Sequence, residues 1–227
     1  MSEEANAAAR LTAYVELLTR YNGALNLLSA QGLRDVERLL ADGRGYATLI
    51  EELAGSTATV VDVGSGAGFP GVVIAAMLPH ATVHLVERRR RRAAFLELAV
   101  GSIGLANATV FSGDVRRLTA VCADVVTAQA VTTLGDLLGL TRHLHREESF
   151  LISRRGPDWR SELDAVSGAL EGSYPAALPR QARVTTAGTS TAANDAAVAV
   201  VAERDLDQSG SLVALRLTGG PACRSSG

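Results

Sequence analysis

The chain has 227 residues, a formal net charge of −2, 47% hydrophobic residues and 20% charged residues. This length and composition fit one sizeable α/β domain with an appendage and argue against wholesale disorder. The near-neutral charge argues against a protein that coats nucleic acid indiscriminately, although a local basic patch could still steer a nucleic-acid substrate. The first residues lack the basic and apolar regions of a signal peptide, and no apolar run is long enough to span a membrane. We therefore expect a soluble, cytoplasmic protein.

The first part of the chain carries apolar residues at helical spacing. This spacing predicts one helix over 8–28 and a second over 33–53, which Gly43 and Gly45 could divide into two shorter helices. No strand-like run occurs here. Residues 1–55 are therefore predicted to form an N-terminal helical cap.

From residue 56 to 218, strand-like apolar runs alternate with stretches of helical pattern. Strands are expected at 58–63, 82–86, 108–111, 123–127 and 149–153, and helices at 71–78, 89–103, 134–144 and 162–170. This alternation predicts a doubly wound α/β fold with a mostly parallel sheet. Three later strand-like runs, at 182–186, 197–202 and 211–218, compete for the remaining sheet positions. Residues 219–227 are expected to be a loose tail.

A glycine-rich loop, residues 62–71, joins the first predicted strand of this region to a helix. Its four glycines are Gly64, Gly66, Gly68 and Gly71. The last three fit the fingerprint of a dinucleotide site, whereas the first three fit the loop of a methyltransferase. Asp62 favours the methyltransferase, because a carboxylate at the strand end would attract the amino group of a methionyl moiety and would repel a pyrophosphate. The loop therefore predicts a site for S-adenosylmethionine.

Acidic residues follow the next two predicted strands. Glu87 ends the second strand, where a carboxylate can accept hydrogen bonds from both hydroxyls of a ribose. Asp114 follows the third strand, where it could contact an adenine amino group or could equally be an ordinary turn residue. Both positions fit a nucleoside-containing cofactor.

Five consecutive arginines, Arg88, Arg89, Arg90, Arg91 and Arg92, stand at the start of a predicted helix. A charge run is commonly a solvated helix face. Here, however, the helix dipole disfavours each cation by about 0.3–1 kcal/mol, so local stability does not explain the run. We expect these arginines to contact RNA phosphates.

Residue types that the predicted site lacks narrow the range of atoms that could accept the methyl group. The segment 127–131 contains neither the proline nor the aromatic residue that methylation of an exocyclic amino group commonly uses. Carbon-5 methylation needs a nucleophilic cysteine, but Cys122 precedes the fourth strand and Cys223 lies in the tail. A ring nitrogen such as guanine N7 needs no general base. His143 and His145 are expected to be surface residues, and no metal site is predicted.

Residues 62–71 resemble, almost letter for letter, the cofactor loop of bacterial methyltransferases that modify guanine N7 in small-subunit ribosomal RNA, the glucose-inhibited division protein B family. The segments 17–27, 85–88 and 95–96 match as well, and the resemblance covers roughly residues 11–156. It implies a class I methyltransferase with an N-terminal helical cap. It also implies S-adenosylmethionine as cofactor, and ribosomal RNA or the small ribosomal subunit as partner.

The resemblance also adds contacts to the site by position: Gly64 and Phe69 at the cofactor, and Val115 and Arg116 beside the adenine. The predicted cofactor site as a whole comprises Asp62, Gly64, Ser65, Gly66, Gly68, Phe69, Glu87, Asp114, Val115 and Arg116.

The chain departs from the family pattern at several places. Leu39 replaces a histidine, Arg116 a glutamate and Gln129 an arginine, whereas Arg155 keeps the charge of a lysine. Gln129 and Arg155 are the candidates for orienting the substrate. Two rival hypotheses stay open, a divergent methyltransferase of small molecules and a non-catalytic RNA-binding or ribosome-binding protein that retains the fold.

Overall fold

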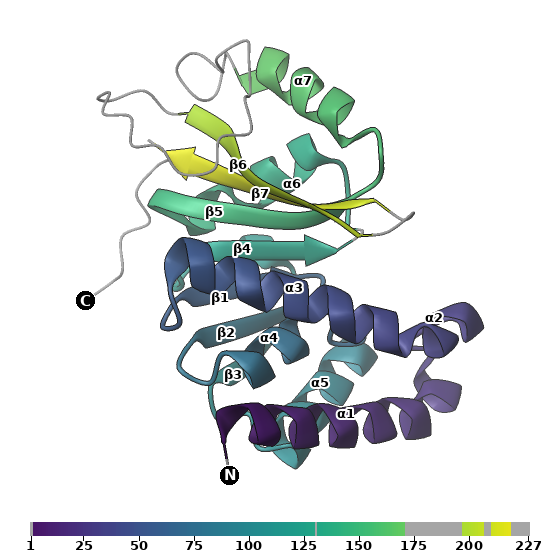
Figure 1. The fold of residues 1–227 in the computed structure, drawn as a ribbon. Helices are drawn as coiled ribbons and strands as arrows, with labels where there is room; N and C mark the ends of the chain where they lie inside the picture. The colour runs from purple at the N-terminus through teal and green to yellow at the C-terminus, as the bar shows by residue number, and fades with distance from the viewer. Residues whose placement is uncertain (1, 130, 171–196, 207–209, 219–227) are drawn as a thin grey trace.

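The computed structural model describes residues 2–129, 131–170, 197–206 and 210–218, and the structural statements below concern these ranges. They form a seven-stranded sheet with helices on both faces (Figure 1). The strands are β1 (Thr59–Val63), β2 (Thr82–Glu87), β3 (Ala108–Ser112), β4 (Ala123–Gln129), β5 (His145–Arg155), β6 (Ala197–Asp205) and β7 (Ser211–Thr218). The helices are α1 (Glu3–Leu25), α2 (Ala30–Arg34), α3 (Val36–Ala54), α4 (Gly71–Met77), α5 (Arg90–Ser102), α6 (Leu134–Thr141) and α7 (Trp159–Leu170), with 3₁₀ turns at Val115–Arg117 and Arg142–Leu144.

The strands lie across the sheet in the order β3-β2-β1-β4-β5-β7-β6. Neighbours among β1 to β5 pair in parallel, and β7 runs antiparallel to both β5 and β6. The chain moves outward from β1 to β3 and then returns to place β4 beside β1, which creates a topological switch point. The predicted doubly wound, mostly parallel fold is confirmed. The late runs 197–202 and 211–218 became β6 and β7, whereas 182–186 and the predicted tail 219–227 lie outside the described residues.

Each face of the sheet carries its own hydrophobic core, because side chains alternate along a strand. Val60 and Val125 belong to the core beneath α1, α3, α4 and α5. Val61 and Val126 belong to the core beneath α6 and α7. The N-terminal helices thus share one of the two cores of the sheet. No helix in the described ranges is long and apolar enough to cross a membrane.

Helix α1 begins earlier and ends earlier than its apolar spacing predicts. Ser2 caps its start, because the Ser2 hydroxyl accepts a hydrogen bond from the Ala5 N–H at 3.3 Å. Asn26 ends the helix in the left-handed conformation, with φ of 50°. The side chain of Asn22 then bonds both backbone groups of Leu28, at 3.1 Å and 2.8 Å, and so fixes the turn that follows. A turn of this kind leaves the apolar spacing intact, so the spacing alone could not reveal it.

Helix α3 runs unbroken through Gly43 and Gly45, so the alternative of a helix divided at these glycines is wrong. Gly43 is needed for the packing of α3 on α4, because a Cβ there would lie 2.7 Å from the Cβ of Val73. A Cβ at Gly45 would meet only Leu212 Cδ2, at an ordinary 3.6 Å. The first glycine therefore lets two helices approach closely rather than interrupting one of them.

These two glycines give a matched pair of substitutions in one helix. Gly43→Ala should lower the free energy of unfolding, because overpacking costs about 1–3 kcal/mol and the gain in helix propensity offsets only about 1 kcal/mol. Gly45→Ala should leave the stability unchanged or raise it by up to about 1 kcal/mol. Urea unfolding followed by circular dichroism measures both. Equal effects of the two substitutions would contradict the close approach of α3 and α4.

Candidate active site

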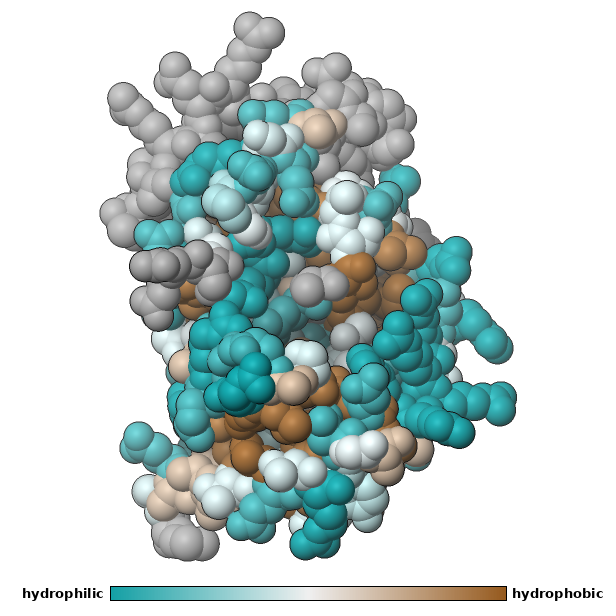
Figure 2. Space-filling model, turned by 90° about the vertical axis from the view of Figure 1, so that its right-hand side faces the viewer, coloured by the Kyte–Doolittle hydropathy of each residue, from teal (hydrophilic) through white to brown (hydrophobic). Residues whose placement is uncertain are grey.

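A cavity of about 640 Å³ opens at the carboxyl ends of β1, β2 and β4, beside the topological switch point. Ligand sites in doubly wound folds occur at this place, and the volume falls within the usual range for small molecules. Figure 2 views the molecule from the side toward which β4 points in Figure 1, and shows apolar surface in brown framed by hydrophilic residues in teal. Among the predicted cofactor residues, those that line the cavity are Gly64, Ser65, Gly66, Phe69, Glu87, Asp114, Val115 and Arg116.

The loop after β1 folds back onto the end of β2. The backbone N–H groups of Gly64 and Ser65 both donate to the carbonyl oxygen of Val86, at 2.9 Å and 3.0 Å. Gly64, Gly66 and Gly68 have φ values of 73°, 58° and 111°, which side chains other than hydrogen rarely tolerate. Glycines at this spacing therefore let the main chain itself form the floor of the cavity.

Glu87 holds this loop and also faces the cavity. Its side chain is 5% exposed. One carboxylate oxygen accepts the Gly66 N–H at 3.0 Å, and the other accepts the Arg89 N–H at 2.7 Å. A carboxylate offers about four acceptor positions, so two backbone donors leave capacity for the hydroxyls of a ligand. The position and the chemistry of Glu87 both fit a ribose ligand.

Tyr14 of α1 packs under the loop. In the sequence, only its helical spacing marks it as a buried residue, and nothing indicates a role in the site. Its buried hydroxyl donates to the carbonyl oxygen of Ala67, and its ring packs edge-on against Phe69 with 5.5 Å between the ring centroids. A Cβ at Gly68 would lie 2.6 Å from the Tyr14 hydroxyl. Burial, together with the charge of Asp62, raises the pKa of Tyr14, so this hydroxyl stays a donor. Helix α1 thus contributes directly to the shape of the loop.

Asp62 lies beneath the loop and does not line the cavity. It is fully buried, and its Oδ1 accepts a hydrogen bond from the Thr127 hydroxyl at 2.8 Å. Its Oδ2 packs against the start of α4, where a Cβ on Gly71 would stand 2.6 Å away. The predicted contact with the methionyl amino group is corrected by this placement, because the alternation of β1 directs position 62 toward α4. Asp62 instead joins β1, β4 and α4 under the loop.

Keeping the Asp62 carboxyl group charged at this position costs free energy, because the group is buried. Burial raises the pKa of its carboxyl to about 6, although hydrogen bonds such as the one from Thr127 oppose the shift. The carboxyl therefore titrates just below neutral pH rather than in the usual acidic range.

Asp114 and Arg116 line the cavity as one ion pair. The Asp114 carboxylate accepts from the Arg116 backbone N–H at 3.0 Å and from its guanidinium at 2.9 Å and 2.6 Å. These hydrogen bonds hold the pKa of Asp114 well below its usual range. Asp114 also caps the short 3₁₀ turn that begins at Val115. Both interpretations of Asp114 from the sequence therefore stay open, since a capping carboxylate still has room for an adenine amino group.

The five arginines fall into two groups in the structure. Arg88, Arg89, Arg90 and Arg91 are exposed around the start of α5. Arg92 is partly buried, and its guanidinium donates to the carbonyl oxygen of Asn26 at 3.0 Å. It lines the cavity, as Arg88 and Arg89 also do, and its Nη1 lies 3.6 Å from the place that a Cβ on Gly66 would take. We therefore separate Arg92, which joins α5 to the turn after α1, from the four exposed arginines.

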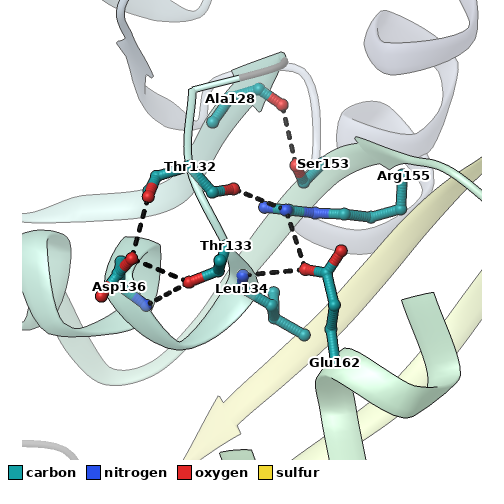
Figure 3. Close-up of polar contacts among 8 residues, drawn as sticks. All are labelled: Ala128, Thr132, Thr133, Leu134, Asp136, Ser153, Arg155 and Glu162. Atoms are coloured by element: carbon teal, nitrogen blue, oxygen red, sulfur yellow. Dashed lines mark hydrogen bonds and ion pairs between the residues drawn. The ribbon is translucent and has the colours of Figure 1, made fainter. Parts of the chain in front are cut away.

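The two candidates for orienting the substrate occupy different environments. Gln129 lines the cavity, as does Leu39 at the position where the resemblance would place a histidine. Arg155 does not line it. Its side chain lies behind the segment that joins β4 to α6 and donates to Thr132 and Glu162 (Figure 3). Arg155 could therefore orient a substrate only indirectly, because the last residue of β5 points toward α7.

The histidines are not both on the surface, so that prediction is wrong for His145. This side chain is 1% exposed and is hydrogen-bonded at 3.0 Å to both Thr141 and Ser149. Burial lowers the pKa of His145 to about 4. Among the described residues, no group of three or more potential metal ligands occurs. Cys223 lies outside the described residues.

Comparison with known proteins shows the family to which this chain is similar. The family model described as rRNA small subunit methyltransferase G matches residues 7–174. A protein of Neisseria meningitidis serogroup C named ribosomal RNA small subunit methyltransferase G is 35% identical over 158 residues, which cover 69% of this chain and 74% of that protein. A protein of Thermobifida fusca with the same name is 36% identical over 163 residues, covering 71% and 68%.

Solved structures share the fold at low sequence identity. A cofactor-bound protein from MTB aligns over 94% of this chain and 91% of its own, with a TM-score of 0.59 and 15% identity. At that identity the likeness concerns the fold alone, which agrees with the strand order and with the place of the cavity.

The raised pKa of Asp62 predicts a pH dependence that substitution should remove. Between about pH 3.8 and 6 the folded protein binds more protons at this group than the unfolded chain does. The contribution of Asp62 to stability is therefore fully present below the lower value and is lost as the pH rises through about 6. Relative to the parent, Asp62→Asn should gain about 2–3 kcal/mol of unfolding free energy between about pH 4 and pH 7.

Urea unfolding at several pH values measures this difference. Asp114→Asn is the control, because the lowered pKa of Asp114 puts its titration below this window. Parallel pH profiles for the parent and Asp62→Asn would show that the buried carboxyl has its ordinary pKa.

Proposed function

Because the chain belongs to the rRNA small subunit methyltransferase G family, we propose that it transfers a methyl group from S-adenosylmethionine to guanine N7 in small-subunit (16S) ribosomal RNA. The observation that carries the proposal is the glycine loop, held by Glu87 at one side of a cavity whose other wall contains Gln129. The proposed partner is ribosomal RNA or the small ribosomal subunit. Such a substrate would place the protein in the cytoplasm.

The described residues fit the cofactor. A Cβ at Gly66 would meet protein atoms only at ordinary distances of 3.5 Å and 3.6 Å. Glycine is therefore needed at this position for its positive φ rather than for lack of space, and there is room for a ligand above the loop. Glu87 supplies acceptors for ribose hydroxyls, and Val86 and Val115 supply apolar walls suited to an adenine ring. When bound, S-adenosylmethionine supplies a methyl group on a positively charged sulfur.

The opposite wall fits a nucleobase better than a charged acceptor. Leu28 lines it from the turn after α1, Leu39 from α3 and Leu140 from α6, so apolar surface is available for the faces of a base. Gln129 adds a neutral amide that can donate to or accept from a base edge. Guanine N7 carries its lone pair at neutral pH, so these residues need only align it with the methyl group.

Methyl transfer to small ribosomal subunits tests the proposal directly. Subunits that lack the N7 methyl group should accept label from radioactive S-adenosylmethionine, and mass spectrometry of the nucleosides should identify 7-methylguanosine. Label in a small molecule would support a divergent methyltransferase. Binding to RNA without transfer would leave only a binding protein with the same fold.

Glu87→Ala should weaken S-adenosylmethionine binding about 10- to 100-fold, equivalent to about 1.4–2.8 kcal/mol. Both the lost acceptor and the released Gly66 N–H contribute to this effect. Calorimetry measures it, with Glu97→Ala on the exposed side of α5 as the control. Unchanged affinity in Glu87→Ala would show that Glu87 does not bind the cofactor.

Two of the exposed arginines, Arg90 and Arg91, should act through RNA rather than through the cofactor. Arg90 and Arg91 are exposed and do not line the cavity, so changing both to Gln should weaken RNA binding and spare cofactor affinity. The slope of log affinity against log salt should decrease by about 0.7 for each phosphate of single-stranded RNA that an arginine no longer neutralises. The control changes Arg146 and Arg216 to Gln, which form ion pairs with Asp124 and Glu148. Equal salt slopes in the parent and the Arg90/Arg91 variant would show that these arginines only form a solvated helix face.

A further inference from the structure

The wall of the cavity that faces the cofactor loop lies in the segment between β4 and α6, of which residues 129 and 131–134 are described. Gln129, Val131 and Thr132 line the cavity. The side chain of Val131 lies directly over Gly64, since a Cβ on that glycine would stand 3.0 Å from Val131 Cγ2. The position of this segment therefore sets the distance between an acceptor and the cofactor loop.

The beginning of the segment is fixed at the end of β4. The carbonyl oxygen of Ala128 accepts hydrogen bonds from the Ser153 hydroxyl at 2.9 Å and from the Tyr46 hydroxyl at 3.0 Å. Both donors are buried and come from different elements, β5 and α3. The two hydrogen bonds thus hold the main chain in place where the segment begins.

The end of the segment is held by one ion pair, in which the Arg155 side chain is buried and the Glu162 side chain is 37% exposed. Arg155 Nη1 donates to the carbonyl oxygen of Thr132 at 2.8 Å and to Glu162 Oε2 at 3.2 Å. The same Glu162 oxygen accepts the backbone N–H of Leu134, the first residue of α6, at 3.0 Å. Figure 3 shows these three contacts converging behind the segment. One carboxylate oxygen therefore joins β5, α7 and the start of α6.

The ion pair is poorly explained by stability alone. The Arg155 side chain is only 9% exposed, and removing a guanidinium from water costs free energy that a single ion pair often fails to recover. Burial lowers the pKa of Arg155, which is the same cost expressed as a proton equilibrium. Its Nε has no hydrogen-bond partner among the described residues. An apolar side chain of similar volume would fill this space without the penalty, but it could not hold the Thr132 carbonyl.

We propose that Arg155 and Glu162 are positioning residues that hold residues 131–134 of this segment in the position required to orient the acceptor base. This inference rests on the proposed methyl transfer. In-line transfer demands close alignment, and a displacement of about 1 Å in a supporting element can cost about 100-fold in rate. Arg155 holds the segment through the Thr132 carbonyl, on the side away from the cavity, and so does not touch the substrate.

The test uses Arg155→Met, Arg155→Lys and Glu162→Gln in the full-length protein. Arg155→Met should lower the single-turnover rate on unmethylated small subunits by about 10- to 100-fold, with both substrates saturating. The dissociation constants for S-adenosylmethionine and for the subunit should stay within about threefold of the parent, because neither residue lines the cavity. Arg155→Lys should restore most of the rate, since a single nitrogen of Arg155 makes both contacts. Glu162→Gln should fall between the two.

The matched control is Arg160→Met. Arg160 is also on α7 and pairs with Glu203 of β6, so the substitution breaks an ion pair of the same helix away from the segment. Its single-turnover rate should equal that of the parent. A rate loss equal to that of Arg155→Met would show that any disturbance of α7 slows the reaction, and would overturn the specific role of Arg155.

Hydrogen exchange of the Leu134 amide separates this inference from the proposed function, because it needs no activity. Exchange should be faster in Arg155→Met and Glu162→Gln, and unchanged in Arg160→Met. If the parent transfers no methyl group, the proposed function fails, while the exchange result still reports on the ion pair. If exchange accelerates but the single-turnover rate holds, the ion pair is structural only and the inference is wrong.

Discussion

The close return of the main chain from β1 to the end of β2 is the constraint on which the rest of the site depends. Val86 receives two consecutive N–H groups of the loop, and Glu87 receives a third from Gly66. Side chains at Gly64 or Gly66 would have to adopt φ values of 73° or 58°, where L-residues are rare. The tight turn directs α4 back over the sheet, and the main chain of the loop stays at the edge where a ligand can approach.

The N-terminal helices are joined to the walls of the site by two tyrosines. Tyr14 holds the Ala67 carbonyl from α1. Tyr46 of α3 donates to Ala128 and accepts the Arg154 N–H at 2.8 Å, so it joins β4 to β5. Each hydroxyl is buried and satisfied, as buried polar groups must be. The helices that the sequence pattern sets apart as a cap therefore also determine the shape of the floor and of one wall of the cavity.

The sequence predicted the parts of this protein that depend on local pattern. Alternating apolar runs indicated the order of strands and helices, and the glycine loop with Glu87 indicated where the cavity lies, because these features are encoded in adjacent residues. The direction of a side chain at a strand end is not local. Asp62 was expected to meet the methionyl amino group and Arg155 to orient the substrate. Strand alternation instead turns Asp62 under α4, and Arg155 pairs with Glu162 of a later helix behind the wall. His145 was expected at the surface, but the fold buries it at the start of β5.

Glu87 illustrates how folding prepares the site before any ligand arrives. Its carboxylate is almost fully buried and already bonded to two main-chain donors, so it loses most of its hydration when the chain folds. A hydroxyl that later approaches has little water to displace, and the side chain has no rotamer freedom left to lose. Selectivity follows from the same preorganisation. In the proposed site, a fixed and dehydrated carboxylate would favour a neutral donor of the right spacing over a phosphate, so the loop would discriminate among nucleoside ligands by charge as well as by shape.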